Sequence, residues 1–483
     1  MNLEDLKDKK VTVMGIGLHG GGLGVVKFFA KQGAKVLATD LRKEKELKES
    51  LEKIKDLPVE LVLGEHRTKD FEETDLVIKN PAVPEKSEFL EIARKRNIPI
   101  DSDIGIFLEL CPAPIIGVTG TKGKSTTSSI LAHLLKKKYH NVILAGNIRT
   151  SVLEKLPEIN KDSVVVLELS SWQLADAKSH KKSPHVSVIT NVFPDHQDRY
   201  SSYNEYVEDK KLIFRFQDEK DFLFLNYGEQ NLQEMAGEAK SKVYFYSPNG
   251  DELLMEDWPP HLRQAPRIGA YARGEKIYFG ANKEEICALS DIKIPGRHVL
   301  NNALAAISVA KLFDVPSQDI KSALAEFPGL EGRLQLVAEK RGVKYYNDTT
   351  ATNPDAAIAA ISAFEQKEEL EPNLILIAGG ADKDLEFEEM AKKINQSCKA
   401  AILLDGTATE KLEQKIRENL SSGRKKELII KKTDDINEAV LISRDFSTKG
   451  DIVLLSPGAA SFGLFRHSYE RGEKFMEVVK NLK

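Results

Sequence analysis

The sequence predicts an α/β fold built from three domains. Short apolar runs alternate with amphipathic stretches along most of its 483 residues. This alternation is typical of parallel sheets that helices cover on both faces. The apolar runs gather in three clusters, and a chain of this length has room for three domains of ~100–200 residues each.

The apolar runs give the expected strands in chain order. A middle stretch, residues 219–295, also carries short β-like runs and is expected to be a small mixed region appended to the second domain. The expected strands are Val11–Ile16, Lys35–Ala38, Leu61–Leu63, Leu76–Ile78, Ile115–Val118, Val164–Leu167, Val186–Thr190, Phe222–Leu225, Val243–Tyr246, Lys276–Phe279, Lys344–Tyr346, Leu374–Ala378, Ala401–Leu404 and Ile452–Leu455. Helical patterns follow several of them, among them Val25–Gln32, Thr127–Leu135 and Gln318–Glu326.

Turn chemistry places the breaks between the domains. Cys111-Pro-Ala-Pro114 holds two prolines just before an expected strand. Phe327-Pro-Gly-Leu-Glu-Gly332 is a second stretch rich in turn residues. We therefore expect domains over 1–112, 113–330 and 331–483.

Composition and charge exclude several classes of protein. Lys plus Arg number 70 and Asp plus Glu number 74, a formal net charge of −4. This near balance argues against a protein that binds nucleic acid through bulk positive charge. No apolar run approaches the ~18 residues of a membrane helix, and the three cysteines do not form a disulfide pattern. We expect a cytoplasmic monomer that binds neither nucleic acid nor membrane.

The first glycine-rich turn follows the first expected strand. Gly15-Ile-Gly-Leu-His-Gly20 matches G-x-G-x-x-G, and Asp40 ends the next strand 20 residues after Gly20. Such a turn lets a pyrophosphate approach the backbone at a helix N-terminus, while the acidic residue accepts from a ribose hydroxyl. The pattern predicts a nucleotide-containing ligand. It leaves open a dinucleotide, a nucleotide-sugar and a tight turn that binds nothing.

The second glycine-rich turn is more specific. Ile115-Ile-Gly-Val-Thr-Gly-Thr-Lys-Gly-Lys-Ser-Thr126 runs from an apolar strand through a polar loop into a helical pattern. The N–H groups of such a loop cradle phosphates, Lys124 neutralises the outer phosphates, and the Ser125 hydroxyl can bind Mg²⁺. We predict ATP binding here, although the glycines do not follow the strict P-loop spacing.

This variant spacing resembles the ATP loop of the Mur ligases, which are ATP-dependent amide ligases of peptidoglycan synthesis. Further motifs of that family follow in order: Glu168-Leu-Ser-Ser171, Asn191-x-x-x-Asp-His196 and Tyr206-x-x-x-Lys210. The resemblance covers essentially the whole chain. It implies a Rossmann-like N-terminal domain, a central P-loop-type ATPase domain and a C-terminal Rossmann-like domain.

The resemblance also implies the roles of individual residues around ATP. The catalytic residues would be Lys124, His196 and Lys210. Two Mg²⁺ ions would be held by Ser125, Glu168, His196 and Lys210, one of them through a carbamate on Lys210. ATP would be bound by Gly120, Thr121, Lys122, Gly123, Lys124, Ser125, Thr126, Asn302, Arg333 and Asp348.

The other two substrates are implied in the same way. Within the family the motifs are closest to the branch that joins glutamate to UDP-N-acetylmuramoyl-L-alanine. The UDP-linked substrate would contact Gly17, Leu18, His19, Asp40, Asn80, Pro81 and Asn147, and the amino acid would contact Thr352, Lys383, Ser461 and Phe462. Thr350 stands where the family usually has a lysine, and an aromatic residue expected near Ser468 is absent, so D- and L-glutamate both stay open.

The expected reaction is an ATP-dependent ligation of D-glutamate through an acyl phosphate. The alternatives are L-glutamate or another acidic amino acid, and a ligase like folylpolyglutamate synthase, which the glycine-rich first domain argues against. An NAD-dependent oxidoreductase would leave the ATP loop without a use. A non-enzymatic ATP switch would leave the loops at Lys383 and Ser461 without one.

Overall fold

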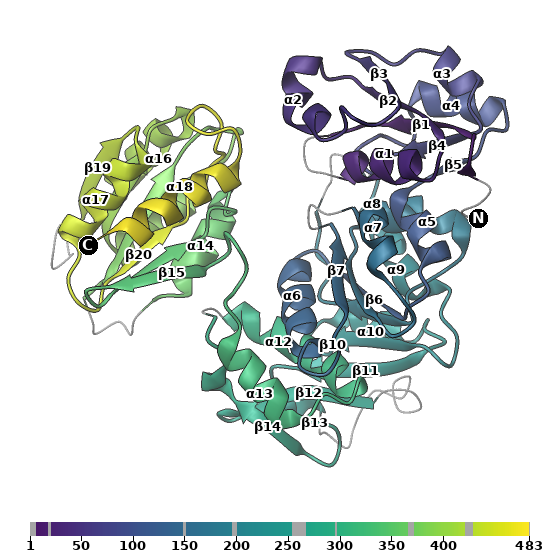
Figure 1. Ribbon diagram of the computed structural model, residues 1–483. Helices are drawn as coiled ribbons and strands as arrows, with labels where there is room; N and C mark the ends of the chain where they lie inside the picture. Colours follow the sequence, from purple (N-terminus) through teal and green to yellow (C-terminus); the bar gives the residue numbers. More distant parts are fainter. Residues whose placement is uncertain are drawn as a thin grey trace. The chain divides into compact units, whose positions relative to one another are not determined.

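The computed structural model describes residues 6–17, 21–147, 151–195, 200–253, 267–294, 297–365, 371–420 and 428–482. Figure 1 shows three β-sheets with helices packed on them, which confirms the expected three-domain α/β fold. The chain divides into two compact units, one made of 1–291 with 301–325 and the other of 292–300 with 326–483. Each unit is described by itself.

The first sheet has five parallel strands in the order β3-β2-β1-β4-β5. Its strands are β1 (Lys10–Met14), β2 (Lys35–Asp40), β3 (Val59–Leu63), β4 (Leu76–Lys79) and β5 (Ile100–Asp101), and its helices are α1 (Gly21–Lys31), α2 (Glu44–Glu52), α3 (Lys69–Glu72) and α4 (Glu88–Lys95). β2 lies on one side of β1 and β4 lies on the other, so the strand order reverses at β1. Such a switch point is where open α/β sheets bind ligands.

The central sheet has nine strands in the order β14-β13-β12-β11-β10-β9-β6-β8-β7. They are β6 (Ile115–Thr119), β7 (Val142–Gly146), β8 (Val164–Glu168), β9 (Val186–Ile189), β10 (Phe222–Asn226), β11 (Lys242–Ser247), β12 (Arg267–Arg273), β13 (Lys276–Phe279) and β14 (Glu284–Ala288). β10 pairs in parallel with β9, so the expected appended region is instead a continuation of the same sheet. β12 still pairs in parallel with β11, and the described pairs β12–β13 and β13–β14 are antiparallel.

Helices and short 3₁₀ turns surround the central sheet. They are α5 (Asp103–Leu110), α6 (Lys124–Leu135), α7 (Val152–Lys155), η2 (Leu156–Glu158), α8 (Ser171–Asp176), η3 (Lys178–His180), α9 (Tyr203–Arg215), α10 (Gln230–Ala236), α11 (Gly250–Leu253), η4 (Leu289–Asp291), α12 (Arg297–Leu312) and α13 (Ser317–Glu326). α5 precedes the expected boundary at residue 112, yet it packs on α7 and α8. The first two sheets therefore share one hydrophobic core.

The third sheet has six strands in the order β15-β16-β20-β17-β18-β19. They are β15 (Gln335–Lys340), β16 (Val343–Asn347), β17 (Leu374–Gly379), β18 (Cys398–Leu404), β19 (Ile429–Thr433) and β20 (Ile452–Leu455), with helices α14 (Pro354–Ser362), α15 (Glu388–Ser397), α16 (Thr407–Glu418), α17 (Ile436–Phe446) and α18 (Ser468–Asn481). Strand β17 is apolar throughout because both of its faces are covered. Leu374 and Leu376 belong to the core under α14–α16, and Ile375 and Ile377 to the core under α17 and α18.

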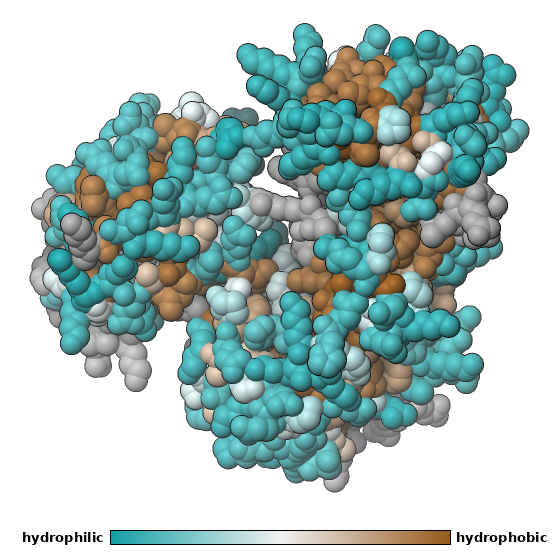
Figure 2. Space-filling view, in the orientation of Figure 1, coloured by the Kyte–Doolittle hydropathy of each residue, from teal (hydrophilic) through white to brown (hydrophobic). Residues whose placement is uncertain are grey.

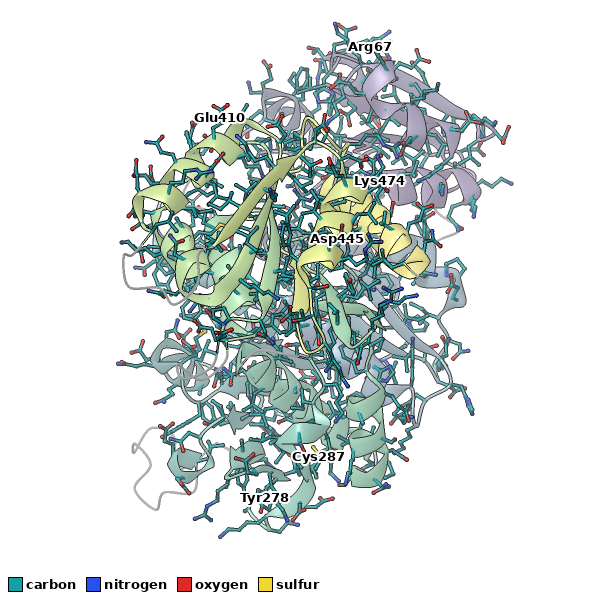
Figure 3. The ribbon with its side chains drawn as sticks, turned by 90° about the vertical axis from the view of Figure 1, so that its left-hand side faces the viewer. Arg67, Tyr278, Cys287, Glu410, Asp445 and Lys474 are labelled. Carbon is teal, nitrogen blue, oxygen red and sulfur yellow. The ribbon has the colours of Figure 1, made fainter. Side chains whose placement is uncertain are left out.

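The surface of the protein is mostly hydrophilic on the face in Figure 2, as expected when the apolar side chains are buried in these cores. Hydrophobic residues show there in smaller areas between the hydrophilic ones. Within the described ranges, no helix is long and apolar enough to span a membrane. None of the three cysteines forms a disulfide, and Cys287 is buried on β14 near the end of the sheet that also carries Tyr278 (Figure 3).

Candidate active site

The loop between β6 and α6 has the geometry of a phosphate-binding loop. Gly120 and Gly123 have backbone φ angles of 148° and 85°, which residues other than glycine rarely adopt. A Cβ on Gly120 would lie 1.9 Å from Thr190 Oγ1, and one on Gly123 would lie 2.3 Å from Asn302 Oδ1. Glycine at both positions therefore lets the loop close tightly in front of the N-terminus of α6, where an anion is favoured.

The segment after β9 holds this loop in place. The Lys122 N–H donates to Asn191 Oδ1 at 2.9 Å, and Asn191 Nδ2 donates back to the Lys122 carbonyl at 3.0 Å. Thr190 Oγ1 donates to the same carbonyl at 2.6 Å. Thr121 Oγ1 lies 2.9 Å from the Tyr206 hydroxyl on α9. Residues after β9 and on α9 thus both hold the backbone and side chains of this loop.

Lys124 starts α6 and folds back over the loop. Its Nζ donates to the carbonyls of Gly120 at 2.9 Å and Thr121 at 3.1 Å. Ser125 and Thr126 follow it in the first turn and are partly exposed. These three residues and the loop N–H groups thus lie together at the N-terminus of α6, and their role in binding phosphates stays a prediction.

Lys210 comes to the same loop from α9. Its side chain is 1% exposed, its Nζ donates to the Gly120 carbonyl at 3.0 Å, and it lies 4.6 Å from the centre of the Tyr206 ring. Burial, with a smaller contribution from the positive charge of Lys124, lowers the pKa of the Lys210 amine to about 7. A substantial share of these amines is therefore neutral and nucleophilic at physiological pH.

Glu168, at the end of β8, could hold a divalent cation. The residue is 2% exposed, and its Oε1 accepts from Asn147 Nδ2 at 2.9 Å. Its Oε2 is buried without a hydrogen-bond partner among the described residues. A buried carboxylate oxygen with free lone pairs suits Mg²⁺, so the fit to this ion is good on the protein side.

The remaining predicted metal ligands are placed in part. His196 lies outside the described residues, whereas Asp195 just before it is ion-paired with Lys122 at 3.6 Å. Within the described part of the chain, no three His, Cys, Asp or Glu side chains gather as a complete metal site.

Asn302 joins the nucleotide loop from α12. Its Oδ1 accepts from Thr127 Oγ1 at 3.3 Å and lies close to Gly123. Asn302 is therefore a buried neighbour of the loop, and it is not at the N-cap position of its helix because α12 begins at Arg297.

The first glycine-rich turn brings Gly17, Asp40 and Asn80 together at the switch point of the first sheet. The Gly17 N–H donates to Asp40 Oδ2 at 3.0 Å, and Asn80 Nδ2 donates to the Gly15 carbonyl at 3.4 Å. Asp40 thus holds the loop. Pro81 follows Asn80, Leu18 and His19 lie outside the described residues, and Asn147 donates a hydrogen bond to Glu168.

In the other unit, Asp348 directly follows β16 and is almost fully buried. Its Oδ1 accepts from the Leu334 N–H at 3.1 Å and its Oδ2 accepts from Ser456 Oγ at 2.7 Å. Burial raises the pKa of the Asp348 carboxyl to about 7. Arg333 beside it is exposed, and Thr350 Oγ1 donates to the Gly332 carbonyl at 2.8 Å. Thr350, the departure from the family pattern, thus fixes the turn that carries Arg333.

The predicted amino-acid residues lie on three loops of that unit, at the carboxyl ends of adjacent strands. The loops after β17 and β20 are joined because Ala381 and Ala460 form a two-way backbone bridge of 2.9 and 3.1 Å. Lys383 is exposed and lies 5.8 Å from the ring of Phe462, which is 60% exposed. Ser461 is buried beside Phe462, and Thr352 lies in the loop after β16.

The sequence motifs did not single out Arg471 on α18, which the structure places under the same loops. It is 1% exposed, and its Nη2 donates to the Thr349 carbonyl at 3.0 Å. An arginine followed by glycine in an amphipathic helix carries no recognisable signal, so only the packing shows that it is buried.

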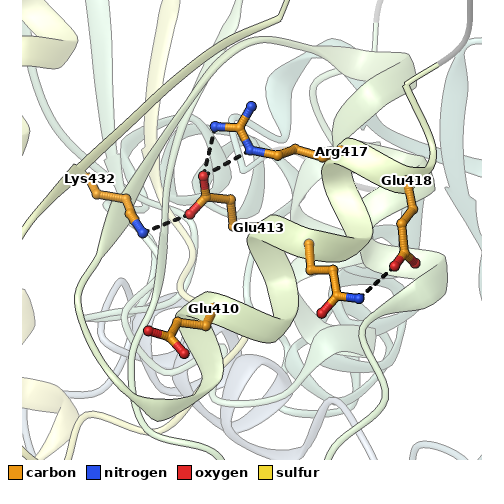
Figure 4. Close-up of a pocket in the computed structure, with 6 residues that line it drawn as sticks. Glu410, Glu413, Arg417, Glu418 and Lys432 are labelled. Atoms are coloured by element: carbon orange, nitrogen blue, oxygen red, sulfur yellow. Dashed lines mark hydrogen bonds and ion pairs between the residues drawn. The ribbon is translucent and has the colours of Figure 1, made fainter.

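A cavity of about 600 Å³ on the outer side of α16 is not part of these sites. Figure 4 shows that its charged side chains are largely paired with one another: Glu413 bonds to both Arg417 and Lys432, and Glu418 to Gln414. A surface whose carboxylates are already paired offers little to a ligand.

Three family models match the chain. They are a Mur ligase MurD-like N-terminal domain over 9–102, a Mur ligase middle domain over 118–310, and a Mur ligase glutamate ligase domain over 332–458. Among similar sequences, a UDP-N-acetylmuramoylalanine–D-glutamate ligase from Roseiflexus sp. is 41% identical over 479 residues, 99% of both chains. One from Acetivibrio thermocellus is 36% identical over 99% of this chain and 97% of its own.

Solved structures resemble the chain in fold. The UDP-N-acetylmuramate–alanine ligase MurC of Thermotoga maritima gives a TM-score of 0.59 at 18% identity and covers 98% of this chain and 100% of its own. The MurF ligase of Thermotoga maritima in complex with ADP gives 0.54 at 17% identity, with 100% of this chain and 97% of its own covered.

Proposed function

The chain belongs to the Mur ligase family, and from this premise we propose that it joins D-glutamate to UDP-N-acetylmuramoyl-L-alanine in an ATP-dependent reaction of peptidoglycan synthesis. One observation carries the proposal: relatives that bear the name of this activity match the chain from end to end at up to 41% identity. The ordered loop at Gly120–Ser125 supports the use of ATP.

The reaction needs activation because a carboxylate is a poor acyl donor. A carboxylate oxygen of the alanyl group forms a bond to the γ-phosphorus of ATP while the β–γ bridging bond breaks, giving an acyl phosphate and ADP. The amine of glutamate then attacks the acyl carbon and loses a proton, and the tetrahedral intermediate collapses to amide and phosphate. Lys124 and the N–H groups of its loop stabilise the charge on the transferred phosphoryl group.

In this proposal Ser125, Glu168, His196 and a carbamate on Lys210 would hold two Mg²⁺ ions. Bound Mg²⁺ supplies positive charge that offsets the negative charge of the phosphates. The orphaned Oε2 of Glu168 and the lowered pKa of Lys210 support these assignments. Carbamylation needs a neutral amine, which adds to CO₂ and loses a proton.

The remaining assignments are also part of the proposal. Residues 1–112 would bind the UDP-linked substrate, 113–330 would bind ATP, and 331–483 would bind the amino acid. Arg333 and Asp348 would complete the ATP site, with Asn302 already at the loop. Lys383, Ser461, Thr352 and Phe462 would receive glutamate. We propose a cytoplasmic monomer.

Phosphate release tests the function directly. The enzyme is given ATP, Mg²⁺ and UDP-N-acetylmuramoyl-L-alanine, with D-glutamate or L-glutamate in separate reactions and with the UDP-linked substrate omitted as the control. We expect release only with D-glutamate and only when the UDP-linked substrate is present. Release with L-glutamate alone would show that the pocket around Thr350 selects the other enantiomer, and release with neither would contradict the proposal.

A further inference from the structure

Arg471 is a buried cation without a carboxylate partner. Its Nε donates to Thr349 Oγ1 at 3.1 Å, its Nη2 donates to the Thr349 carbonyl at 3.0 Å, and Nη1 and Nη2 reach the Ala459 carbonyl at 3.4 and 3.5 Å. All of these acceptors are neutral. Among the residues that the structure describes, no carboxylate lies at ion-pair distance from this guanidinium.

A charge in this position is costly unless something negative approaches it. Burial alone lowers the pKa of the Arg471 guanidinium to about 9, so the group is still charged at neutral pH. A neutral side chain of similar size would pack under the loops without that desolvation penalty. The positive charge therefore has a use beyond packing.

The guanidinium lies where three loops meet. Thr349 belongs to the loop after β16 and Ala459 to the loop after β20, and a Cβ on Gly380, in the loop after β17, would lie 3.6 Å from Arg471 Nη1. The strands β16, β20 and β17 are neighbours in the sheet. These three loops are also the ones that carry Thr352, Ser461 and Lys383.

We propose that Arg471 is a positioning residue for the incoming glutamate: it ties the three amino-acid loops together and places a fixed positive charge beneath them. This inference rests on the proposed function. Glutamate with a neutral amine carries two negative carboxylates, and Lys383 is an exposed cation on these loops. Arg471 supplies the second positive charge from beneath, acting through the loops because it is itself covered.

The test compares two variants. Arg471→Met has a long side chain without charge, and Arg471→Lys keeps the charge but lacks the planar guanidinium with its several N–H donors. Arg417→Met, an exposed arginine on α16, is the matched control. For each variant, KM is measured separately for D-glutamate, ATP and the UDP-linked substrate. Acyl-phosphate formation, which needs no glutamate, is followed by ADP–ATP exchange.

We expect Arg471→Met to raise the KM for D-glutamate at least about tenfold, the change expected when one charged interaction is lost. Its KM for the other two substrates and its exchange rate should change less than about threefold. Arg471→Lys should recover part of the glutamate KM. If Arg471→Met fails to fold, Arg471→Lys decides alone, with a selective rise in the glutamate KM expected.

Two results would overturn the inference: an unchanged KM for glutamate, or parallel losses for all three substrates, which would mean that Arg471 only packs the domain. The function is tested separately by the wild type. If the wild type proves to use L-glutamate, the proposed function fails, and the same KM comparison made with L-glutamate still decides the role of Arg471.

Discussion

Two lysine amines meet at one backbone carbonyl, that of Gly120. Lys124 reaches it from α6 at 2.9 Å and Lys210 from α9 at 3.0 Å. Two ammonium groups this close repel each other, and the more deeply buried one is the easier to deprotonate. Burial of Lys210, with a smaller contribution from the positive charge of Lys124, lowers the pKa of the Lys210 amine to about 7.

Replacing Lys124 tests the first role. Lys124→Ala should lower kcat about 100-fold or more, because it removes a preorganised charge that stabilises the transferred phosphoryl group. Lys136→Ala, an exposed lysine at the other end of the same helix, is the control and should change kcat little. Steady-state phosphate release measures both. A loss below tenfold for Lys124→Ala would remove Lys124 from catalysis.

Replacing Lys210 tests the carbamate. Lys210→Ala should abolish activity, and short carboxylic acids should restore part of it by filling the space of the lost carbamate. The neighbouring Lys211, which pairs with Glu208 and Glu238 on the surface, provides the control, and Lys211→Ala should keep its activity. Full activity of Lys210→Ala would show that no carbamate is needed there.

At this scale the motifs pointed to side chains that the structure places at one edge of the central sheet. Lys124, Lys210 and Glu168 stand in recognisable patterns, and all three lie at its carboxyl edge. Their supporting partners were not predictable. Asn191 and Thr190 hold the Lys122 backbone, and Arg471 supports a loop more than 100 residues away in the chain. Such roles depend on tertiary proximity and have no local pattern.

At the scale of elements, the loop that joins β6 to α6 requires a left-handed backbone conformation at Gly123. An alanine there would carry a strain of about 1–2 kcal/mol and push its Cβ against Asn302 Oδ1. We therefore expect Gly123→Ala to weaken ATP binding about tenfold, measured by calorimetric titration.

A second glycine provides the control for that substitution. Gly21, in the first turn of α1, has open space where a Cβ would be, so Gly21→Ala should leave the ATP affinity unchanged. Equal ATP affinity in Gly123→Ala and the wild type would show that the loop tolerates a right-handed backbone at this position.

In the third sheet, the strands that are buried on both faces were predictable and the two edge strands were missed. β17 and β20 read as continuous apolar runs. β15 (QLVAEK) and β19 (IIKKT) are the two edges of their sheet, and their polar residues hide them from a search for apolar runs. Likewise, the union of β10–β14 with the central sheet follows from the pairing of β10 with β9, which no local pattern reports.

At the scale of the whole molecule, the first two sheets meet through buried ionisable groups. Lys79 at the end of β4 pairs with Asp176 at the end of α8 at 2.6 Å, and His180 Nε2 lies 2.9 Å from Asp101. Asp103, at the start of α5, is buried nearby. Burial raises the carboxyl pKa of both Asp103 and Asp176 to about 6.

This predicts a pH dependence of stability. An unfolded aspartate has a pKa of about 3.9, so between about pH 4 and pH 6 the folded state binds more protons at Asp103 than the unfolded state does. The contribution of Asp103 to the free energy of unfolding therefore falls as the pH rises through this window and is then constant.

The variant Asp103→Asn has no carboxyl group to ionise at this position, so its free energy of unfolding should not fall in this way as the pH rises. At pH 8 it should unfold at a higher temperature than the wild type, by an amount that corresponds to roughly 3 kcal/mol, and the difference should vanish near pH 4. Thermal unfolding at pH 4, 6 and 8 measures it. Asp162→Asn, an exposed aspartate, should show no such trend. A variant less stable than the wild type at pH 8 would mean that the Asp103 charge stabilises the interface.

The three-sheet architecture was predictable because each domain repeats the strand–helix alternation. The order of the strands was not, since neighbours such as β16 and β20 are separated by about a hundred residues, as the pairing of Lys344 with Ile452 shows. Order and register are set by which buried faces fit, and they determine which loops meet around a ligand.

The continuation of the central sheet also has a consequence for any shortened version of the chain. Strand β9, with sequence VSVI, is buried on both faces and is hydrogen-bonded to β6 on one side and β10 on the other. A chain cut after residue 218 would leave β9 as a bare apolar edge, able to recruit the same strand from another copy. The extension therefore shields the edge of β9 from aggregation, and a shortened chain would need another segment to cover it.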